Sequence, residues 1–273
     1  MFKKKIMALL CGVVMISGLV VGCGSSSASD TKKITISGST SVGPTMEVLA
    51  QSYGKNNDVK IEVQQVGSSA GIKNTIDKTS DLGMSSRDLK DEEAKEVDGT
   101  KIAIDGIAVV TNTANKVTNL TSEQVRDIFT GKITNWKEVG GEDSEIVVIS
   151  REEGSGTRDG FQEILGFESE ELTKNAQVCD GSGNVKSTVE GNKNAIAYIS
   201  FGYLSDTLND VKIDGAEATD ENVVEGKYPV SRPFLVINRK DNLSEDAKSF
   251  VEFILSDEGQ SIIAEEGFIR IDK

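Results

Sequence analysis

Histidine is missing from all 273 residues of this sequence, and only three cysteines and three prolines occur in it. Without histidine, a Ser-His-Asp triad, a histidine-ligated zinc ion and acid–base catalysis by imidazole are excluded. The cysteines stand alone at Cys11, Cys23 and Cys179, and Cys11 lies in an N-terminal apolar segment. We therefore expect no disulfide between ordinary side chains, no metal site and no cofactor.

Basic residues are outnumbered, because 30 Lys and Arg stand against 44 Asp and Glu, which gives a formal net charge of −14. Nucleic acids attract basic surfaces through their phosphate backbones, so this balance disfavours a nucleic-acid partner. Any cluster of hydrogen-bond donors and arginines in such a chain therefore stands out against an acidic background.

The N-terminus has the pattern of a secretion signal. Three lysines at 3–5 precede an apolar stretch at 6–21, which is shorter than the ~20 residues of a membrane span. Small residues then lead to Cys23, a pattern that resembles a bacterial lipobox. We predict a lipoprotein signal peptide at 1–22, an acyl chain on Cys23 and a polar tether at 23–30, and therefore a lipid-anchored protein on the extracytoplasmic membrane face. An ordinary secretion signal or a short anchor helix is the alternative.

A strand–turn–helix pattern occurs three times. Alternating or β-branched segments at 32–37, 60–66 and 145–150 predict strands, and each is followed by a turn rich in Ser and Gly. After the first turn, apolar residues from Val42 to Tyr53 recur at helical spacing. This alternation predicts an α/β fold with mainly parallel sheets.

These turns have the chemistry of an anion site. A helix start exposes unpaired N–H groups, its dipole favours negative charge, and Ser and Thr hydroxyls add further donors. The third turn, "REEGSGTRDGF" at 151–161, also supplies Arg151, whose planar guanidinium can grip an oxyanion. The alternative is that these residues are ordinary helix caps. None of the turns matches the dinucleotide-binding or P-loop motifs, which disfavours a nucleotide.

Seven motifs resemble the phosphate-binding lipoproteins that serve bacterial phosphate ABC importers. They are "ISGSTSVGPTMEVLA" (36–50), "VGSSAGI" (66–72), "DLGMSSRDL" (81–89), "LTSEQVRDIFTGKITNWKEVGG" (120–141), "SREEGSGTRDGF" (150–161), "AIAYISFGYL" (195–204) and "YPVSRPFLVIN" (228–238). The resemblance implies a two-lobed type II periplasmic-binding-protein fold with two crossing hinge strands. It also implies a binding protein rather than an enzyme, which captures inorganic phosphate between the lobes and delivers it to the membrane permease subunits of the importer.

The resemblance also sets lobe boundaries. The first lobe would comprise 31–109 and 231–273, and the second would comprise 110–230. We expect the chain to cross between the lobes near 107–112 and to return near 233–238.

The family's ligand-binding residues can be carried over to matching positions of this chain. The resemblance implies phosphate contacts from all three turns, from the arginine and from the segment at 81–89. The expected contacts are Ser39, Thr40, Ser41, Ser68, Ser69, Ser86, Arg87, Arg151, Ser155, Gly156 and Thr157. Glu153 stands where some members carry an Asp that is paired with the arginine, and it is expected behind the ligand shell.

One position departs from the family. Some members have an Asp that accepts the proton of phosphate where this chain has Ser86, beside Arg87. Phosphate carries a proton near neutral pH and sulfate does not, so a buried acceptor would reject sulfate. Asp88, Glu153, a serine oxygen or a backbone carbonyl could be this acceptor. Arg87 could also be a plain surface residue.

Two other functions remain open from the sequence. The chain could bind another oxyanion, such as sulfate or molybdate. It could also be a secreted serine hydrolase with Ser155 or Ser68 as the nucleophile and a lysine as the base, although no Ser-x-x-Lys motif stands in these turns.

The remaining motifs suggest structural roles. Thr121 and Gln124 have capping-box spacing, and Trp136 is expected to pack in the second lobe. The charged run at 90–98 is interpreted as a solvated face. Apolar residues at 247–255 predict a C-terminal amphipathic helix.

Overall fold

A computed structural model of the chain describes residues 32–241 and 243–271. The predicted signal peptide, the tether and Cys23 therefore lie outside the described residues. Residues 31–273 form one compact unit. Within the described part of this unit, no helix has the length and apolarity needed to cross a bilayer.

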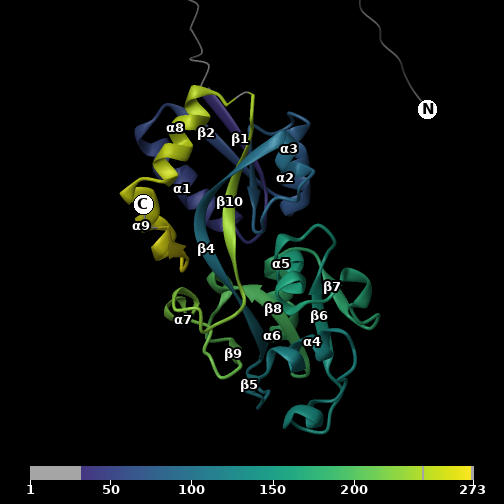
Figure 1. Cartoon of the computed structure of the whole chain (residues 1–273). Coiled ribbons are helices and arrows are strands. Elements are labelled where there is room, and N and C mark those ends of the chain that lie inside the picture. Colours follow the sequence, from purple (N-terminus) through teal and green to yellow (C-terminus); the bar gives the residue numbers. More distant parts are fainter. Residues whose placement is uncertain (1–31, 242, 272–273) are drawn as a thin grey trace, which may run out of the picture. The chain divides into compact units, whose positions relative to one another are not determined.

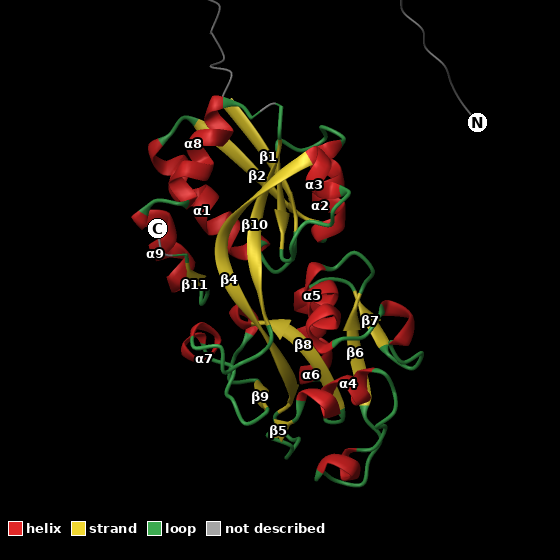
Figure 2. Cartoon of the chain, in the orientation of Figure 1, coloured by secondary structure: helices red, strands yellow, loops and turns green. Residues whose placement is uncertain are grey.

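Strands and helices alternate along the chain, so the predicted α/β class is confirmed (Figure 2). The strands are β1 (Lys32–Gly38), β2 (Val59–Gln65), β3 (Leu82–Ser85), β4 (Val97–Asn112), β5 (Asn119–Leu120), β6 (Val147–Arg151), β7 (Gln177–Cys179), β8 (Ala195–Ser200), β9 (Leu208–Ile213), β10 (Ser231–Arg239) and β11 (Ile269–Arg270). The α-helices are α1 (Gly43–Asn56), α2 (Ser68–Ile76), α3 (Glu93–Glu96), α4 (Ser122–Phe129), α5 (Gly156–Leu165), α6 (Ser182–Glu190), α7 (Asp220–Val224), α8 (Glu245–Ile254) and α9 (Asp257–Glu265). Short 3₁₀ helices occupy Trp136–Val139, Ser169–Glu171 and Phe201–Tyr203.

The described strands join into one continuous sheet with the order β2-β1-β3-β10-β4-β8-β6-β7. β1 is parallel to β2 and to β3, and β6 is parallel to β7 and to β8. The long strands β4 and β10 lie side by side in antiparallel register and join the two parallel groups (Figure 1). The sheet is therefore mixed: the strands that precede the predicted turns are parallel, and the connecting strands are antiparallel.

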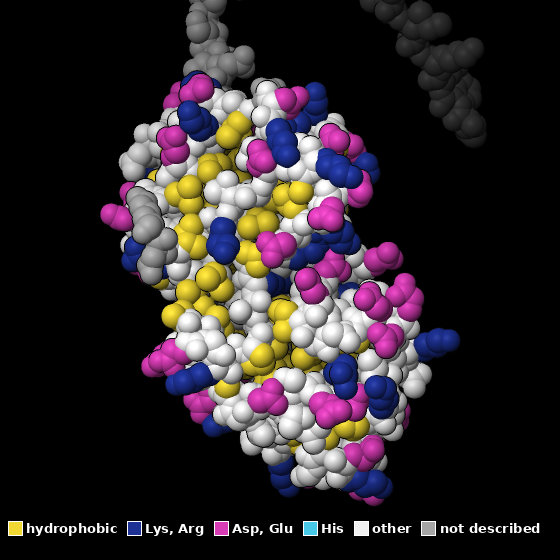
Figure 3. Space-filling view, viewed as in Figure 1, with side chains coloured by type: hydrophobic (Ala, Val, Ile, Leu, Met, Phe, Trp, Pro, Cys, Tyr) yellow, Lys and Arg dark blue, Asp and Glu magenta, His cyan; other side chains and the backbone are white. Residues whose placement is uncertain are grey.

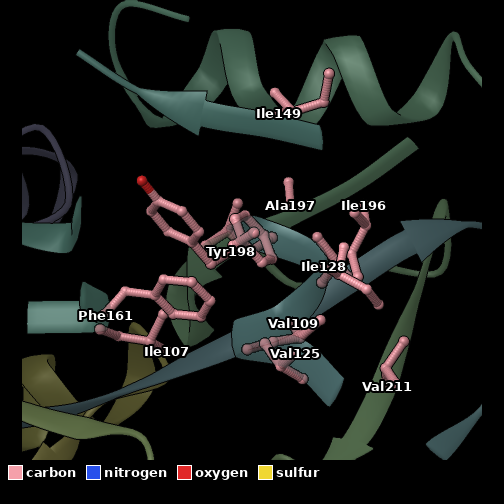
Figure 4. Packing of buried hydrophobic residues seen from close by; sticks show 14 of the residues in the cluster. Ile107, Val109, Val125, Ile128, Ile149, Phe161, Ile196, Ala197, Tyr198 and Val211 are labelled. Atoms are coloured by element: carbon pink, nitrogen blue, oxygen red, sulfur yellow. The ribbon is translucent and has the colours of Figure 1, made fainter. Parts of the chain in front are cut away.

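Two large hydrophobic clusters pack against this sheet. One is built from residues of β1, α1, α8 and their neighbours, and the other from residues between Ile107 and Val230. Figure 4 shows the second cluster, in which Phe161 and Tyr198 stack with their ring centroids 4.1 Å apart. Trp136 is buried in the same cluster and donates from Nε1 to the Asn194 carbonyl, so its predicted packing role is confirmed.

β4 passes from the first cluster to the second between Ala103 and Ile107, a few residues before the predicted crossing at 107–112. On the return, Val230 belongs to the second cluster and Phe234 to the first. The two clusters lie on either side of these strand segments. Whether they behave as two lobes with the predicted boundaries stays a prediction.

Local sequence signals account for where the helices begin. Thr121 caps α4 by accepting from the Gln124 N–H with its hydroxyl, and the Gln124 side-chain oxygen accepts from the Thr121 N–H. The predicted capping box is therefore confirmed. In α1 the apolar residues Met46 and Leu49 are fully buried, as helical spacing predicts. α8 buries its apolar face in the same way.

On the surface, acidic and basic side chains are interspersed over the visible face (Figure 3).

Candidate functional site

The N-terminal ends of four helices bring buried hydroxyl groups together. The turn before α1 supplies Ser39, Thr40 and Ser41, α2 begins at Ser68, α5 begins at Gly156, and α6 begins at Ser182. Each helix follows a strand of a parallel pair directly, so its start lies at the carboxyl edge of that strand. Ligands of open α/β sheets bind at this edge.

One group of hydroxyls links the α1 turn to α5 and α6. Ser41 Oγ lies 2.9 Å from Thr157 Oγ1 and 3.3 Å from Ser182 Oγ. Thr40 Oγ1 lies 3.2 Å from Ser182 Oγ. Ser41, Thr157 and Ser182 are each at most 2% exposed. These contacts join residues more than 100 positions apart in the sequence, so the two halves of the sheet meet here.

A second group of hydroxyls lies on the α2 side. Ser39 Oγ donates to Ser86 Oγ over 2.9 Å, and Ser68 Oγ lies 3.2 Å from Ser86 Oγ. The Ser86 N–H also donates to Ser68 Oγ. The first residue of α5 touches this group, because a Cβ added to Gly156 would stand 2.4 Å from Ser68 Oγ and 2.7 Å from Ser86 Oγ. Gly156 thus places the two sets of hydroxyl-bearing residues next to each other. Together the two sets, Ser41, Thr40, Thr157 and Ser182 with Ser39, Ser68 and Ser86, are called the hydroxyl cluster.

Arg151 ends β6 and reaches the hydroxyl cluster with both terminal nitrogens. Nη1 donates to Ser182 Oγ over 3.0 Å, and Nη2 donates to Thr40 Oγ1 over 2.9 Å. The side chain is 2% exposed. Its backbone N–H donates to the hydroxyl of Tyr198, which is itself buried in the second cluster. The guanidinium is therefore held at the edge of the sheet by groups on several elements.

The carboxylate that pairs with Arg151 is Glu152, which corrects the expectation for Glu153. Arg151 donates to Glu152 through Nε at 2.7 Å and through Nη2 at 2.6 Å, and the Gly181 N–H donates to the same carboxylate. Burial opposes ionisation of Glu152, but the guanidinium outweighs it and lowers the pKa of this carboxyl. Glu153 is exposed instead, because the turn after β6 brings Glu152 toward Gly181.

Arg87 and Ser69 form a network beside the hydroxyl cluster. Both terminal nitrogens of Arg87 donate to Glu93 at 2.8 Å, and Nη2 also donates to Ser69 Oγ. Nε stands 3.0 Å from the Asp159 carboxylate on α5, as an ion pair without the alignment of a hydrogen bond. The Ser69 N–H donates to the Gly154 carbonyl. Arg87 is 4% exposed, so the alternative of a surface residue is wrong.

The contacts of Arg87 also correct the interpretation of the run at 90–98. Glu93 of this run is largely buried against Arg87, which lowers its pKa although desolvation acts in the opposite direction. The same contacts raise the pKa of Arg87 against the effect of its burial. The solvated-face prediction is thus wrong for Glu93, because a buried guanidinium needs a carboxylate partner.

Two functional candidates on the connecting strands escaped the sequence reasoning. Arg232 on β10 faces Asp105 on β4 in strand register, and its Nη2 donates to Asp105 at 2.8 Å and to Ser41 Oγ at 3.2 Å. Burial raises the pKa of the Asp105 carboxyl, against the opposing effect of Arg232. Burial likewise lowers the pKa of Arg232, against the effect of Asp105. The motif "SRPF" at 231–234 was visible in the sequence, but nothing local shows where its arginine ends.

Ser182 also escaped, although a signal existed. The segment "QVCDGSGNV" at 177–185 is a fourth strand, Gly-Ser turn and helix, like the turn at 67–71. β7 is short, with only three residues, so the alternation that predicts a strand is weak there. Ser155, which was expected at the ligand, is buried and caps α5 by accepting from the Arg158 N–H.

The structure therefore brings most of the predicted site residues together. Those in the hydroxyl cluster or bonded to it are Ser39, Thr40, Ser41, Ser68, Ser86, Arg151, Gly156 and Thr157. Asp88 and Glu153, two of the proposed proton acceptors, are exposed. Within residues 32–241 and 243–271, no group of three or more Cys, Asp or Glu side chains is arranged to hold a metal ion.

Chemically, the site is rich in donors. The hydroxyl cluster lies among the starts of four helices. The nearby carboxylates Glu152 and Asp105 are each bound to an arginine. With each arginine balanced in this way, an anion would be held by directed N–H and O–H bonds more than by excess positive charge. This arrangement suits a small oxyanion with several acceptor oxygens.

Known proteins share this fold and much of this sequence. A PBP superfamily domain matches residues 24–258. The phosphate-binding protein PstS of Bacillus subtilis is 31% identical, with 98% of this chain and 94% of that protein covered. A crystal structure from Clostridium perfringens, described as "a Putative Phosphate ABC Transporter Substrate-Binding Protein with Bound Phosphate", is 57% identical with a TM-score of 0.86. It covers 88% of this chain and 100% of that one. An ABC-type phosphate transport receptor from Vibrio cholerae is 39% identical, covers 87% and 100%, and has a TM-score of 0.75.

Proposed function

Because the chain belongs to the PBP superfamily and, within it, to the PstS family of phosphate-binding proteins, we propose that it captures inorganic phosphate and delivers it to an ABC importer. One observation carries the proposal at the level of the site. Buried hydroxyls from four helix starts converge with Arg151 where the carboxyl ends of the two parallel strand groups meet. Such a convergence concentrates donors where a tetrahedral oxyanion can accept them.

The proposed contacts follow from this convergence. Arg151 would keep its bonds to Glu152 and donate to the anion from Nη1 and Nη2, in place of its bonds to Ser182 and Thr40. The hydroxyls and helix N–H groups would donate to the remaining oxygens. The set proposed to touch phosphate is Ser39, Thr40, Ser41, Ser68, Ser86, Arg151, Gly156, Thr157 and, in addition to the earlier expectation, Ser182. Arg87, Ser69 and Glu152 are proposed to support this set from behind.

The expected affinity is consistent with such a site. A micromolar complex requires about −8.2 kcal/mol, and each hydrogen bond to a charged group contributes about 1.5–3 kcal/mol. Several such bonds exceed that requirement even after the cost of association, which is at least about 4 kcal/mol. We therefore expect binding at micromolar phosphate or below.

Delivery would use the two parts of the fold as lobes. We propose that the segments 31–109 and 231–273 form one lobe and 110–230 the other, with β4 and β10 as the hinge strands. Closing around phosphate would create a surface that membrane permease subunits recognise. The chain would act without turnover, as a binding protein rather than an enzyme.

The protein is further proposed to work on the extracytoplasmic face, where an acyl chain on Cys23 would anchor it to the membrane. The support is the lipobox-like end of the apolar segment at 6–21. Metabolic labelling with a fatty acid tests this directly: the wild type should carry the label and Cys23→Ser should lose it. Label that persists in Cys23→Ser would contradict the anchor.

Binding of another oxyanion is the second candidate, because a specific observation favours it. Ser86 stands at the hydroxyl cluster where some family members have an Asp, and Asp88 and Glu153 are exposed. Sulfate rejection would then rest on neutral acceptors. For a serine hydrolase nothing comparable exists, since Ser68 bonds to Ser86 and Ser155 caps a helix.

The test is calorimetric titration of phosphate-stripped protein with phosphate, arsenate, sulfate and molybdate. Phosphate and arsenate should bind with comparable heats, and sulfate should bind much more weakly. Arg151→Ala should weaken phosphate binding at least a hundredfold, and the control Arg126→Ala, at a half-exposed position on α4, should not. Absence of heat and of a thermal shift with phosphate would refute the proposal, and equal binding of sulfate would favour the second candidate.

A further inference from the structure

Arg232 occupies an unusual place for a charged side chain. It lies on β10, between the two hydrophobic clusters, and its side chain is only 2% exposed. Asp105, its partner in strand register on β4, is completely buried. A buried ion pair is a weak source of stability, because desolvation of both charges offsets their attraction. A stabilising role alone therefore accounts poorly for this pair.

The hydrogen bonds of Asp105 fix it firmly. Oδ1 accepts from the Ser200 hydroxyl at 2.8 Å and from the Phe201 N–H at 3.2 Å. Oδ2 accepts from Arg232 Nε at 3.1 Å and from Nη2 at 2.8 Å. Both oxygens are thus engaged by groups from β8, the following turn and β10. Asp105 is a rigid support that presents the guanidinium of Arg232 in one orientation.

The donors of Arg232 are only partly used. Nε bonds to Asp105, and Nη2 bonds to Asp105 and to Ser41 Oγ. Nη1 is buried and has no hydrogen-bond partner. An unpaired buried donor on a charged group is costly, and Nη1 is therefore available to donate to an oxygen of a bound ligand. Nη1 shares its carbon with Nη2, which touches Ser41, so the unused donors lie beside the hydroxyl cluster.

Arg232 reaches the same hydroxyls as Arg151, but from another direction. Ser41 Oγ, which accepts from Arg232, lies 3.3 Å from Ser182 Oγ, which accepts from Arg151. The two guanidinium groups therefore flank the Ser41 and Ser182 hydroxyls.

We propose that Arg232 is a second arginine that binds the anion, donating from Nη1, and that Asp105 is a positioning residue that holds it in place. This inference rests on the proposed function. Arg232 then ties the anion to the strands that join the two hydrophobic clusters. The site holds its ligand between two arginines, each balanced by one carboxylate.

The test combines titration with arginine-detected NMR on the full-length protein in which Cys23→Ser removes the predicted lipid site. Arg232→Lys should raise the phosphate dissociation constant at least tenfold, and Arg232→Gln should raise it further, because neither reproduces the fork. Arg239→Lys is the matched control, since Arg239 lies on the same strand away from the hydroxyl cluster. This control should stay within twofold of the parent.

The NMR arm remains informative if the buried substitutions disturb folding. The chain has seven arginines, and their guanidinium signals can be assigned in the parent protein through the backbone resonances of the same residues. Titration of the parent protein with phosphate should shift the signals of Arg151 and Arg232 together and leave that of Arg270 in place. Asp105→Asn should weaken binding less than Arg232→Gln, because an amide oxygen can still accept from Nε.

The outcomes distinguish a failure of the proposed function from a failure of the proposed role of Arg232. If the parent protein does not bind phosphate, the proposed function fails. If it binds phosphate while the Arg232 signal stays in place and folded Arg232→Lys binds like Arg239→Lys, only the role of Arg232 is overturned. Parallel shifts of Arg151 and Arg232, with the affinity loss confined to the Arg232 variants, support the inference.

Discussion

Gly156→Ala is the substitution for which the structure predicts opposite effects on folding and on binding. Gly156 is the first residue of α5, and no left-handed backbone requires a glycine there. Alanine is favoured over glycine within helices by up to about 1 kcal/mol. The fold of the residues around α5 should therefore tolerate the methyl group. The contact of α5 with Ser68 and Ser86 should not tolerate it.

The size of the clash follows from the distances. The added Cβ would stand 2.4 Å from Ser68 Oγ, 2.7 Å from Ser86 Oγ and 3.0 Å from Ser68 Cβ. An ordinary contact begins at 3.4 Å, so the Ser68 and Ser86 hydroxyls must rotate out of their present bonds or α5 and α2 must separate by up to about 1 Å. Overpacking of this kind costs about 1–3 kcal/mol. Because the two helices belong to the two sides that would close on phosphate, this cost should appear as a roughly 5- to 150-fold loss of phosphate affinity.

Titration calorimetry and thermal unfolding of the ligand-free protein measure the two effects separately. The control is Gly183→Ala near the start of α6, where an added Cβ meets no heavy atom within 4 Å. The control should gain a little stability and keep its affinity for phosphate. A Gly156→Ala variant that binds phosphate as tightly as the wild type would refute the closed arrangement of Ser68, Ser86 and α5.

Three further predictions concern the surroundings of the cluster. Asp159→Asn removes the ion pair with Arg87, and the loss of about 1 kcal/mol of interaction free energy should raise the phosphate dissociation rate about fivefold. The control Glu163→Gln, one turn further along α5, should leave this rate unchanged. Equal dissociation rates of the two variants in stopped flow would contradict the prediction. Ser86→Asp should weaken sulfate binding more than phosphate binding, because only protonated phosphate can donate to the new carboxylate, and competition titration that shows equal losses would exclude Ser86 from the anion. The lowered pKa of Glu93 stabilises the fold fully above its ordinary pKa of 4.5, and this contribution is lost as the pH falls through the lower folded-state value. Glu93→Gln should therefore lose less unfolding free energy than wild type between pH 5 and pH 3 in urea titrations, and parallel losses would argue against the Arg87 pairing.

The family resemblance and the local patterns together anticipated most of the hydroxyl cluster. The turns that follow the strands of one parallel pair collect at the carboxyl end of that pair. The two pairs run in opposite directions, and the tertiary structure brings their carboxyl ends together. The fourth turn at Ser182 was missed because β7 has only three residues. A strand this short gives no clear alternation, although the Gly-Ser signature after it is the same as at Ser68.

The partners of the charged residues were harder to predict from the sequence. Glu152 and Glu153 are adjacent and chemically identical, and only the path of the turn beside Gly181 selects Glu152 for Arg151. Similarly, nothing in the run at 90–98 distinguishes Glu93 from its neighbours until Arg87 is seen against it. Pairing between long charged side chains depends on three-dimensional distances, which periodicity does not encode.

The sequence by itself indicated three strands, at 32–37, 60–66 and 145–150, the apolar faces of several helices, and the gathering of donors at helix starts. These properties depend on alternation, helical spacing and capping, which act over a few residues. Only the tertiary structure decided that Arg232 and Asp105 stand opposite each other. They are 127 residues apart, and the antiparallel register of β4 and β10 brings them together beside Ser41. Strand register is set by packing across the whole sheet, so no local pattern could have placed this arginine.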